Sequence, residues 1–199
     1  MMFWTSLFHP QDQSRQQCSG GCSASRRQQG RIPWWQRGKL PDHWLVSRFV
    51  ERVVLTDPEA LEAVRGRGVL FVANHQVGIE SLLFSVVGSA LVQSPTATLA
   101  KREHATSWLG ELIAHCFAYP GVRDPGLIAF FNREDPSSLP RILQTLGAGM
   151  AGASRSLLVH VEGTRALSCR APVQTMSGSL IDMALRAGAP VVPVRFVGG

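Results

Sequence analysis

The sequence predicts an α/β fold with a mainly parallel or mixed sheet that is flanked by helices. Short apolar, β-branched runs alternate with longer stretches of helical character, an order typical of α/β proteins. The expected strands are 69–73, 97–100, 127–132, 156–161 and 190–196. With 199 residues and no internal repeat, the chain is expected to hold one main domain.

The first expected helix has apolar residues at helical spacing between Asp42 and Leu55. It is predicted to pack on the core or to lie in a membrane interface, and packing is the commoner outcome. Asp57-Pro58-Glu59 is typical of a helix start and predicts a short helix to Val64. The apolar stretch 79–93 is long enough for the next helix.

Three further helices are expected at 106–117, 136–152 and 177–187. Residues 147–152 match the pattern Gly-x-Gly-x-x-Gly, but a dinucleotide site needs a strand before this pattern and a helix after it. Here the expected order is reversed, so we interpret these glycines as a helix C-cap and turn. The sequence also has no Gly-x-Ser-x-Gly elbow and no Walker loop.

The charge is concentrated in residues 1–40, which hold six Lys or Arg and one Asp, a net +5 of the total +6. The segment is rich in Gln, Ser, Gly and Arg, which predicts a disordered basic tail before a folded domain at 41–199. Such a tail, close to Trp34 and Trp35, suits an anionic membrane surface. Nucleic acid is a competing partner, and a solvated leader without function is a further alternative.

No apolar stretch reaches the ~20 residues of a membrane-spanning helix, because Leu82 to Val92 is interrupted by Ser and Gly. Residues 1–8 do not have the pattern of a signal peptide. The four cysteines have no Cys-x2-Cys spacing and are expected to be reduced thiols: Cys18, Cys22, Cys116 and Cys169. A cytoplasmic protein in peripheral contact with membranes is the expected class.

His75 and Glu80 are candidate catalytic residues, since they follow the expected strand 69–73 as His-x4-acid. Gly78 permits a turn that folds the carboxylate back onto the imidazole. The acid would fix the tautomer and stabilise the imidazolium when the ring accepts a proton. The alternative is a structural histidine followed by an acidic helix start.

Glu162-Gly163-Thr164-Arg165 follows the expected strand 156–161. Gly163 lets backbone amides approach a ligand, Thr164 adds a hydroxyl and Arg165 adds charge suited to a phosphate. An ordinary turn with exposed charges is the alternative.

In this order the segments resemble the glycerolipid acyltransferases of the lysophosphatidic-acid type. Asn74 to Glu80 is similar to the first block of that family, Asn-His-x4-Asp. Gly126 to Arg133 resembles the second block with one extra residue, and His160 to Arg165 resembles the third, Phe-Pro-Glu-Gly-Thr-Arg. The Pro-containing strand 189–194 resembles the fourth block, so the likeness covers residues 50–199.

The resemblance implies a glycerol-phosphate-acyltransferase-like fold and transfer of a fatty acyl group to a hydroxyl of a lysophospholipid or glycerol phosphate. The donor would be a thioester of CoA or acyl carrier protein, without a metal, another cofactor or a covalent enzyme intermediate. His75 would be the general base and Glu80 its orienting acid. The residues implied in acceptor binding are Arg133, Glu162, Gly163 and Thr164. Arg165 joins them as a predicted binding residue because its charge suits a phosphate.

Several residues depart from the family pattern. Glu80 stands in the place of Asp, and His160-Val161 in the place of Phe-Pro. Residues 174–178 lie where the family often has a Lys, which weakens the expectation of a phosphorylated acceptor. The family domain normally continues beyond the fourth block, so a truncated domain is expected. An acyltransferase of phospholipid biosynthesis is the leading interpretation, and a non-catalytic lipid-binding or scaffold module of the same fold is the competing one.

Overall fold

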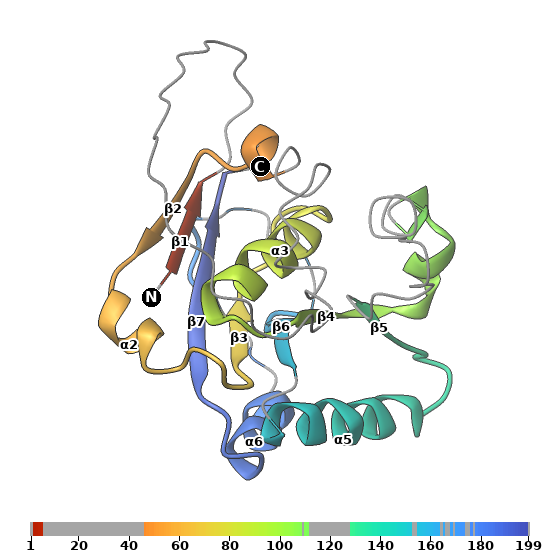
Figure 1. Ribbon diagram of the computed structural model, residues 1–199. Coiled ribbons are helices and arrows are strands. Elements are labelled where there is room, and N and C mark those ends of the chain that lie inside the picture. The colour runs from red at the N-terminus through yellow and green to blue at the C-terminus, as the bar shows by residue number, and fades with distance from the viewer. Residues whose placement is uncertain are drawn as a thin grey trace, which may run out of the picture.

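The computed structural model describes residues 2–5, 46–108, 110–111, 128–152, 155–163 and 178–198, and also residues 165, 168, 170–173 and 176. These residues form a central sheet with helices on both faces, so the predicted α/β class is confirmed (Figure 1).

The sheet has seven strands in the order β2-β1-β7-β3-β6-β4-β5. Among the described strand pairs, β1 and β2 are antiparallel and the other five pairs are parallel. The strands are β1 Met2–Thr5, β2 Arg52–Leu55, β3 Leu70–Ala73, β4 Thr96–Lys101, β5 Ile128–Phe131, β6 Ser156–His160 and β7 Val191–Val197. The parallel arrangement brings the carboxyl ends of β3, β6 and β7 to one edge of the sheet.

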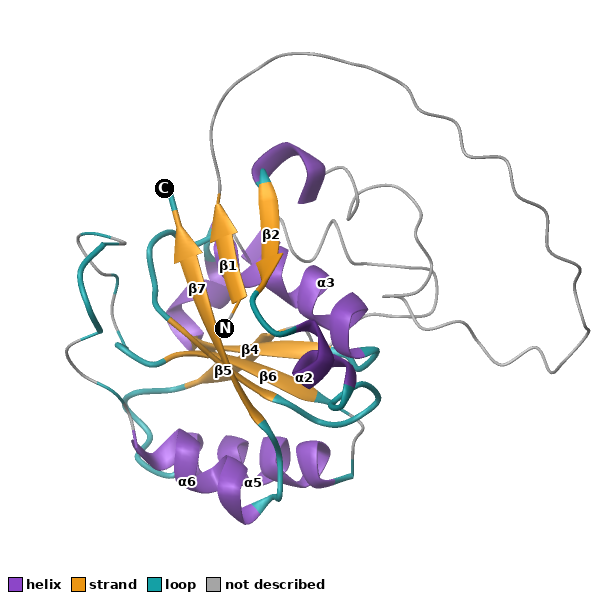
Figure 2. Ribbon diagram, turned by 90° about the vertical axis from the view of Figure 1, so that its left-hand side faces the viewer, coloured by secondary structure: helices purple, strands orange, loops and turns teal. Residues whose placement is uncertain are grey.

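The helices cover the two faces of the sheet separately (Figure 2). Helices α2 Pro58–Glu62 and α3 Glu80–Val92 lie on one face, and α5 Ser138–Ala151 and α6 Gly178–Arg186 lie on the other. A short 3₁₀ helix, η2 Arg102–Thr106, follows β4. None of the helices in the described part of the chain has the length and apolarity that crossing a bilayer requires.

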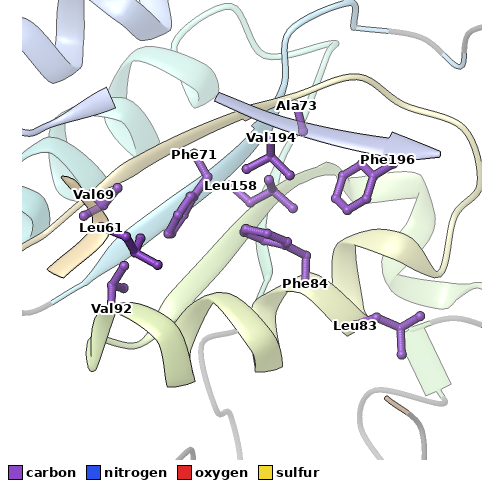
Figure 3. Close-up of a cluster of buried hydrophobic side chains, with 10 residues drawn as sticks. All are labelled: Leu61, Val69, Phe71, Ala73, Leu83, Phe84, Val92, Leu158, Val194 and Phe196. Atoms are coloured by element: carbon purple, nitrogen blue, oxygen red, sulfur yellow. The ribbon is translucent and has the colours of Figure 1, made fainter. Parts of the chain in front are cut away.

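Two apolar clusters hold these layers together, and β3 contributes to both because its side chains alternate between the faces. Phe71 packs under α3, where its ring centroid lies 5.0 Å from that of Phe84 (Figure 3). Leu70, on the opposite face, belongs to the cluster under α5 and α6. The four residues of β3 have little exposure, as expected for a strand covered on both sides.

The five predicted strands and the helices 79–93, 136–152 and 177–187 are confirmed to within a few residues. The predicted helix start at Asp57 is also confirmed, because its carboxylate accepts a hydrogen bond of 2.9 Å from the Ala60 N–H. Residues 147–151 form the last turns of α5, and the Gly152 N–H donates to the Ala148 carbonyl. A helix thus precedes β6 as expected and Gly152 is its C-cap, but Gly147 and Gly149 lie inside the helix and not in a turn.

The helix predicted from Asp42 to Leu55 is wrong in its second half. Residues 46–49 are helical, but Arg52–Leu55 form strand β2 and pair with β1. The segment Arg52-Val53-Val54-Leu55 has two adjacent β-branched residues, which favour a strand once a partner strand is present. The helical spacing of apolar residues did not reveal that partner.

The predicted tail 1–40 differs from the structure at its beginning. Residues Met2–Thr5 form strand β1 between β2 and β7, and residues 6–40 lie outside the described part of the chain. Met-Phe-Trp-Thr is apolar and suited to a strand, and β7 offers it unpaired backbone groups. The predicted helix 106–117 also lies largely outside the described residues.

Candidate active site

The candidate site forms where β3 and β6 end side by side. These strands are parallel neighbours, and their register pairs Ala73 with His160. The segment that follows Ala73 therefore lies next to the segment that follows His160, although 87 residues separate them in the sequence. Crevices at the carboxyl ends of strands are the usual ligand sites of open α/β sheets.

His75 and Glu80 are in direct contact. His75 Nδ1 lies 2.6 Å from Glu80 Oε1, and Glu80 is only 3 % exposed. The same carboxylate accepts hydrogen bonds from the Gln76 N–H at 2.7 Å and the Val77 N–H at 3.2 Å. An ionised carboxylate can only accept, so we assign the Nδ1–H tautomer to His75. Nε2 is then the nitrogen that can accept a proton.

Asn74 fixes the start of this loop to a third strand. Its side-chain amide donates to the Phe196 carbonyl at 3.0 Å, and its side-chain oxygen accepts from the Phe196 N–H at 2.7 Å. Phe196 belongs to β7, which is the other neighbour of β3. The first block is therefore tied to β7 by two hydrogen bonds.

Glu162 joins the third block to the first. Its Oε2 accepts a hydrogen bond of 3.2 Å from the backbone N–H of His75. Gly163 follows with φ of +67°, a backbone conformation that glycine adopts without strain. Glu162 was predicted to bind the acceptor; in the structure its carboxylate binds the backbone of the His75 loop.

His160 is a residue of this site that the sequence analysis did not identify. Its ring stacks on that of His75, with centroids 4.1 Å apart and planes 28° apart. His160 Nδ1 lies 2.8 Å from the Asn74 carbonyl, which can only accept, so Nδ1 carries the proton. Nε2 then accepts a hydrogen bond of 2.7 Å from the Ser81 hydroxyl.

The His160 ring is held in its neutral form. Burial lowers its pKa from the usual 6.5 to about 3, and repulsion from the neighbouring His75 contributes, while the hydrogen bond to the Asn74 backbone acts in the opposite direction.

His75, Glu80 and His160 also offer ligand atoms within 4.8 Å of one another, close enough to share a metal ion. Two stacked rings direct their nitrogen lone pairs side by side instead of toward one point. Glu80 already accepts hydrogen bonds from the ring and from two backbone amides. The donor set fits a hydrogen-bonded network better than a metal centre.

A cavity of about 560 Å³ adjoins this network, within the size range of small-molecule sites. His75, Ser81 and His160 line it. Apolar residues form much of the wall: Leu82, Leu99, Ile128, Phe130, Val159 and Leu180. Besides His75 and His160, the basic side chains in the lining are Lys101, His104, Arg133 and Arg165. The cavity therefore offers an apolar surface and positive charge to one ligand.

The structure places most of the predicted site residues around this cavity. His75, Arg133, Gly163 and Arg165 line it, while Glu80 and Glu162 contact the segment 75–77. Thr164 lies outside the described residues.

Lys101, His104, Ser81 and His160 were not predicted as site residues. Lys101 ends β4 at the same side of the sheet, so its position after a strand was an available signal. His160 likewise ends β6, but it precedes the Glu162–Arg165 pattern from which the site was predicted.

The fold and this constellation define a class of protein. A family model described as Acyltransferase matches residues 52–197. The chain belongs to this family, that of glycerolipid and lysophosphatidic acid acyltransferases, and is an acyltransferase enzyme. The comparison with curated proteins gave no match.

Proposed function

We propose that this acyltransferase moves a fatty acyl group from a thioester to a hydroxyl of a lysophospholipid or glycerol phosphate, with His75 as the general base. The observation that carries the proposal is the 2.6 Å contact between His75 and the buried Glu80 beside a cavity. Glu80 holds the Nδ1–H tautomer, which leaves Nε2 to accept the hydroxyl proton.

In the proposed reaction, the acceptor hydroxyl donates a hydrogen bond to His75 Nε2. As the hydroxyl oxygen attacks the thioester carbonyl, the proton moves to Nε2 and Glu80 stabilises the imidazolium. Collapse of the tetrahedral intermediate forms the ester and breaks the carbon–sulfur bond. The proton on His75 passes to the departing thiolate, so that the imidazole is neutral for the next cycle.

The acceptor is proposed to be anionic. Arg133 and Arg165 line the cavity, and Lys101 adds a third basic group. These cations offset the missing Lys near residues 174–178, which had weakened the expectation of a phosphate. Gly163 and Glu162, with Thr164 after them, are proposed to position the glycerol part.

The apolar part of the lining supports an acyl chain as the other half of the substrate. CoA and acyl carrier protein are both proposed as carriers of the thioester, and the reaction as written needs no metal or other cofactor. Lipid substrates would bring the protein to a membrane surface, so we propose peripheral contact from the cytoplasmic side and a role in phospholipid biosynthesis. We propose no nucleic-acid partner.

A direct test is acyl transfer by the purified full chain. The protein is incubated with radiolabelled palmitoyl-CoA or palmitoyl-acyl carrier protein and either glycerol 3-phosphate or a panel of lysophospholipids, and labelled lipid is separated. We expect labelled product with at least one anionic acceptor and its loss in His75→Ala. Transfer to these acceptors at the same rate in His75→Ala would refute the general-base assignment.

A further inference from the structure

We propose that His160 is a positioning residue that holds the His75 imidazole in its reactive orientation. This inference rests on the proposed role of His75. The family resemblance places Phe at this position in the third block, so the imidazole is a departure in this chain. A phenylalanine would supply a ring for stacking but neither of the two hydrogen bonds that fix the His160 ring.

Hydrogen bonds at both ring nitrogens of His160 fix the orientation of its ring plane. Nδ1–H donates to the Asn74 carbonyl at 2.8 Å, and Nε2 accepts from the Ser81 hydroxyl at 2.7 Å. One partner belongs to the loop after β3 and the other to the first turn of α3. A ring tied to two elements has little freedom to rotate, and it presents one fixed face to His75.

His75 is held in a complementary way. Glu80 binds Nδ1 and so restrains one edge of the ring. A single hydrogen bond still allows the ring plane to rotate about the Nδ1–Oε1 direction. The stack with His160, 4.1 Å between centroids, limits that rotation. Together the two neighbours fix the direction in which Nε2 accepts a proton. Catalytic geometry of this kind is sensitive to displacement, and a shift of about 1 Å can cost about 10²-fold in rate.

The neutral state of His160 matters for the same reason. Because its pKa is lowered to about 3, the ring stays uncharged when His75 becomes an imidazolium. The cation then meets the π face of a neutral ring, an attractive contact, instead of a second positive charge. A buried histidine that titrated together with His75 would oppose the proton transfer that the reaction needs.

Three variants separate the ring from its hydrogen bonds. His160→Phe keeps an aromatic ring and removes both bonds, whereas His160→Asn keeps a donor near the Nδ1 position and removes the stack. Ser81→Ala removes the bond to Nε2 and leaves the bond to Asn74. Ser85→Ala is the matched control, because Ser85 lies one turn further along α3 and bonds to the Ser81 carbonyl.

Steady-state kinetics with palmitoyl-CoA and an accepted anionic acceptor give the first readout. We expect kcat to fall by about ten- to a hundredfold in His160→Phe and His160→Asn, with KM for both substrates unchanged. Ser81→Ala should fall by less than about tenfold and Ser85→Ala should match the wild type. Wild-type kcat in both His160 variants overturns the proposal. An acylated Ser81 in the mass spectrum also overturns it, because Ser81 and His160 would then act as nucleophile and base.

The second readout does not need turnover. Ring ¹⁵N signals of His75, assigned by their loss in His75→Ala, report its tautomer and hydrogen bonding. We expect a fixed Nδ1–H tautomer in the wild type and signals shifted toward a tautomer mixture in His160→Phe and His160→Asn. Unchanged signals in both variants contradict the proposal even if the chosen substrates are not turned over. If the wild type shows the fixed Nδ1–H tautomer, the variants show a mixture and no acceptor is acylated, the proposed function fails while the positioning role of His160 stands.

Discussion

The two halves of the candidate active site hold their polar groups in different ways. The half formed by His75, Glu80 and His160 is largely buried, and hydrogen bonds join it to Asn74 in the loop after β3 and to Ser81 in the first turn of α3. The half formed by Arg133 and Arg165 is exposed, although both residues line the same cavity. The groups assigned to proton transfer are thus fixed before a substrate arrives, while the groups assigned to anion binding remain in contact with water.

We expect the two halves to affect different kinetic constants. A preorganised, water-poor network does not have to reorganise during the reaction, so its loss should lower kcat. Exposed cations act through a screened field and through long, adaptable side chains, so their loss should mainly weaken binding. Each prediction below tests one side of this comparison.

The largest effect is expected from His75→Ala. Removing a general base typically costs about 10²–10⁴ in rate, so kcat should fall by at least about 10² with little change in KM. Kinetic measurement with circular dichroism as the folding control checks this outcome. A variant that is folded and retains wild-type kcat would show that the buried half does not carry the chemistry.

Glu80→Gln should come next, because the amide keeps the size of the side chain but loses the charge that stabilises the imidazolium. We expect kcat to fall by about 10² or more, and stability to fall because two backbone donors lose a charged acceptor. Glu80→Asp is one methylene shorter and should be impaired less. Kinetics and urea unfolding check both, with Glu62→Gln as the control, since Glu62 makes an exposed ion pair on α2. Equal activity of the wild type, Glu80→Gln and Glu80→Asp would show that Glu80 does not contribute to catalysis.

Arg133→Ala and Arg165→Ala test the exposed half. Each should raise KM for an anionic acceptor by about tenfold, near the energy of one partly screened charge contact, and leave kcat almost unchanged. The wild-type KM should rise with salt, and the variants should respond less. Arg186→Ala is a suitable control because Arg186 pairs with Asp182 at 2.8 Å and does not line this cavity. A fall in kcat with constant KM would place these arginines in the chemistry instead.

The last expected effect concerns stability instead of catalysis, and is a pH dependence that comes from His160. Its folded pKa of about 3 lies below the usual 6.5, so the unfolded chain binds a proton that the folded chain excludes. The stabilising contribution is complete above about pH 6.5 and is lost as the pH falls from there toward about 3, at up to about 1.4 kcal/mol per pH unit. His160→Phe lacks this group. As the pH falls below about 6.5, its free energy of unfolding should therefore increase relative to that of the wild type, at up to that slope per pH unit. Urea unfolding at pH 7.5, 6 and 5 measures the difference, and a constant difference would show that His160 is not held neutral.

The strands and the principal helices could be predicted from the sequence because their signals are local. The run Leu70–Ala73 is continuously apolar and is buried on both faces, and Asp57-Pro58 begins α2 as its capping chemistry requires. Strands β1 and β2 were not predicted, because their signals are not local. Whether Met2–Thr5 and Arg52–Leu55 become strands depends on pairing with each other and with β7, which lies more than 130 residues further along the chain.

Local residue patterns were enough to predict the class of fold, the His75–Glu80 pair and the loop after β6, because each depends on residue types within a few positions of one another. Only the tertiary structure decided that Ala73 and His160 are neighbours in the sheet and that Glu162 reaches the His75 backbone. It also decided that His160 stacks on His75 while bound to Asn74 and Ser81. The physical reason is that strand order sets these contacts, and strand order follows from how the whole chain buries its apolar faces, not from any local pattern.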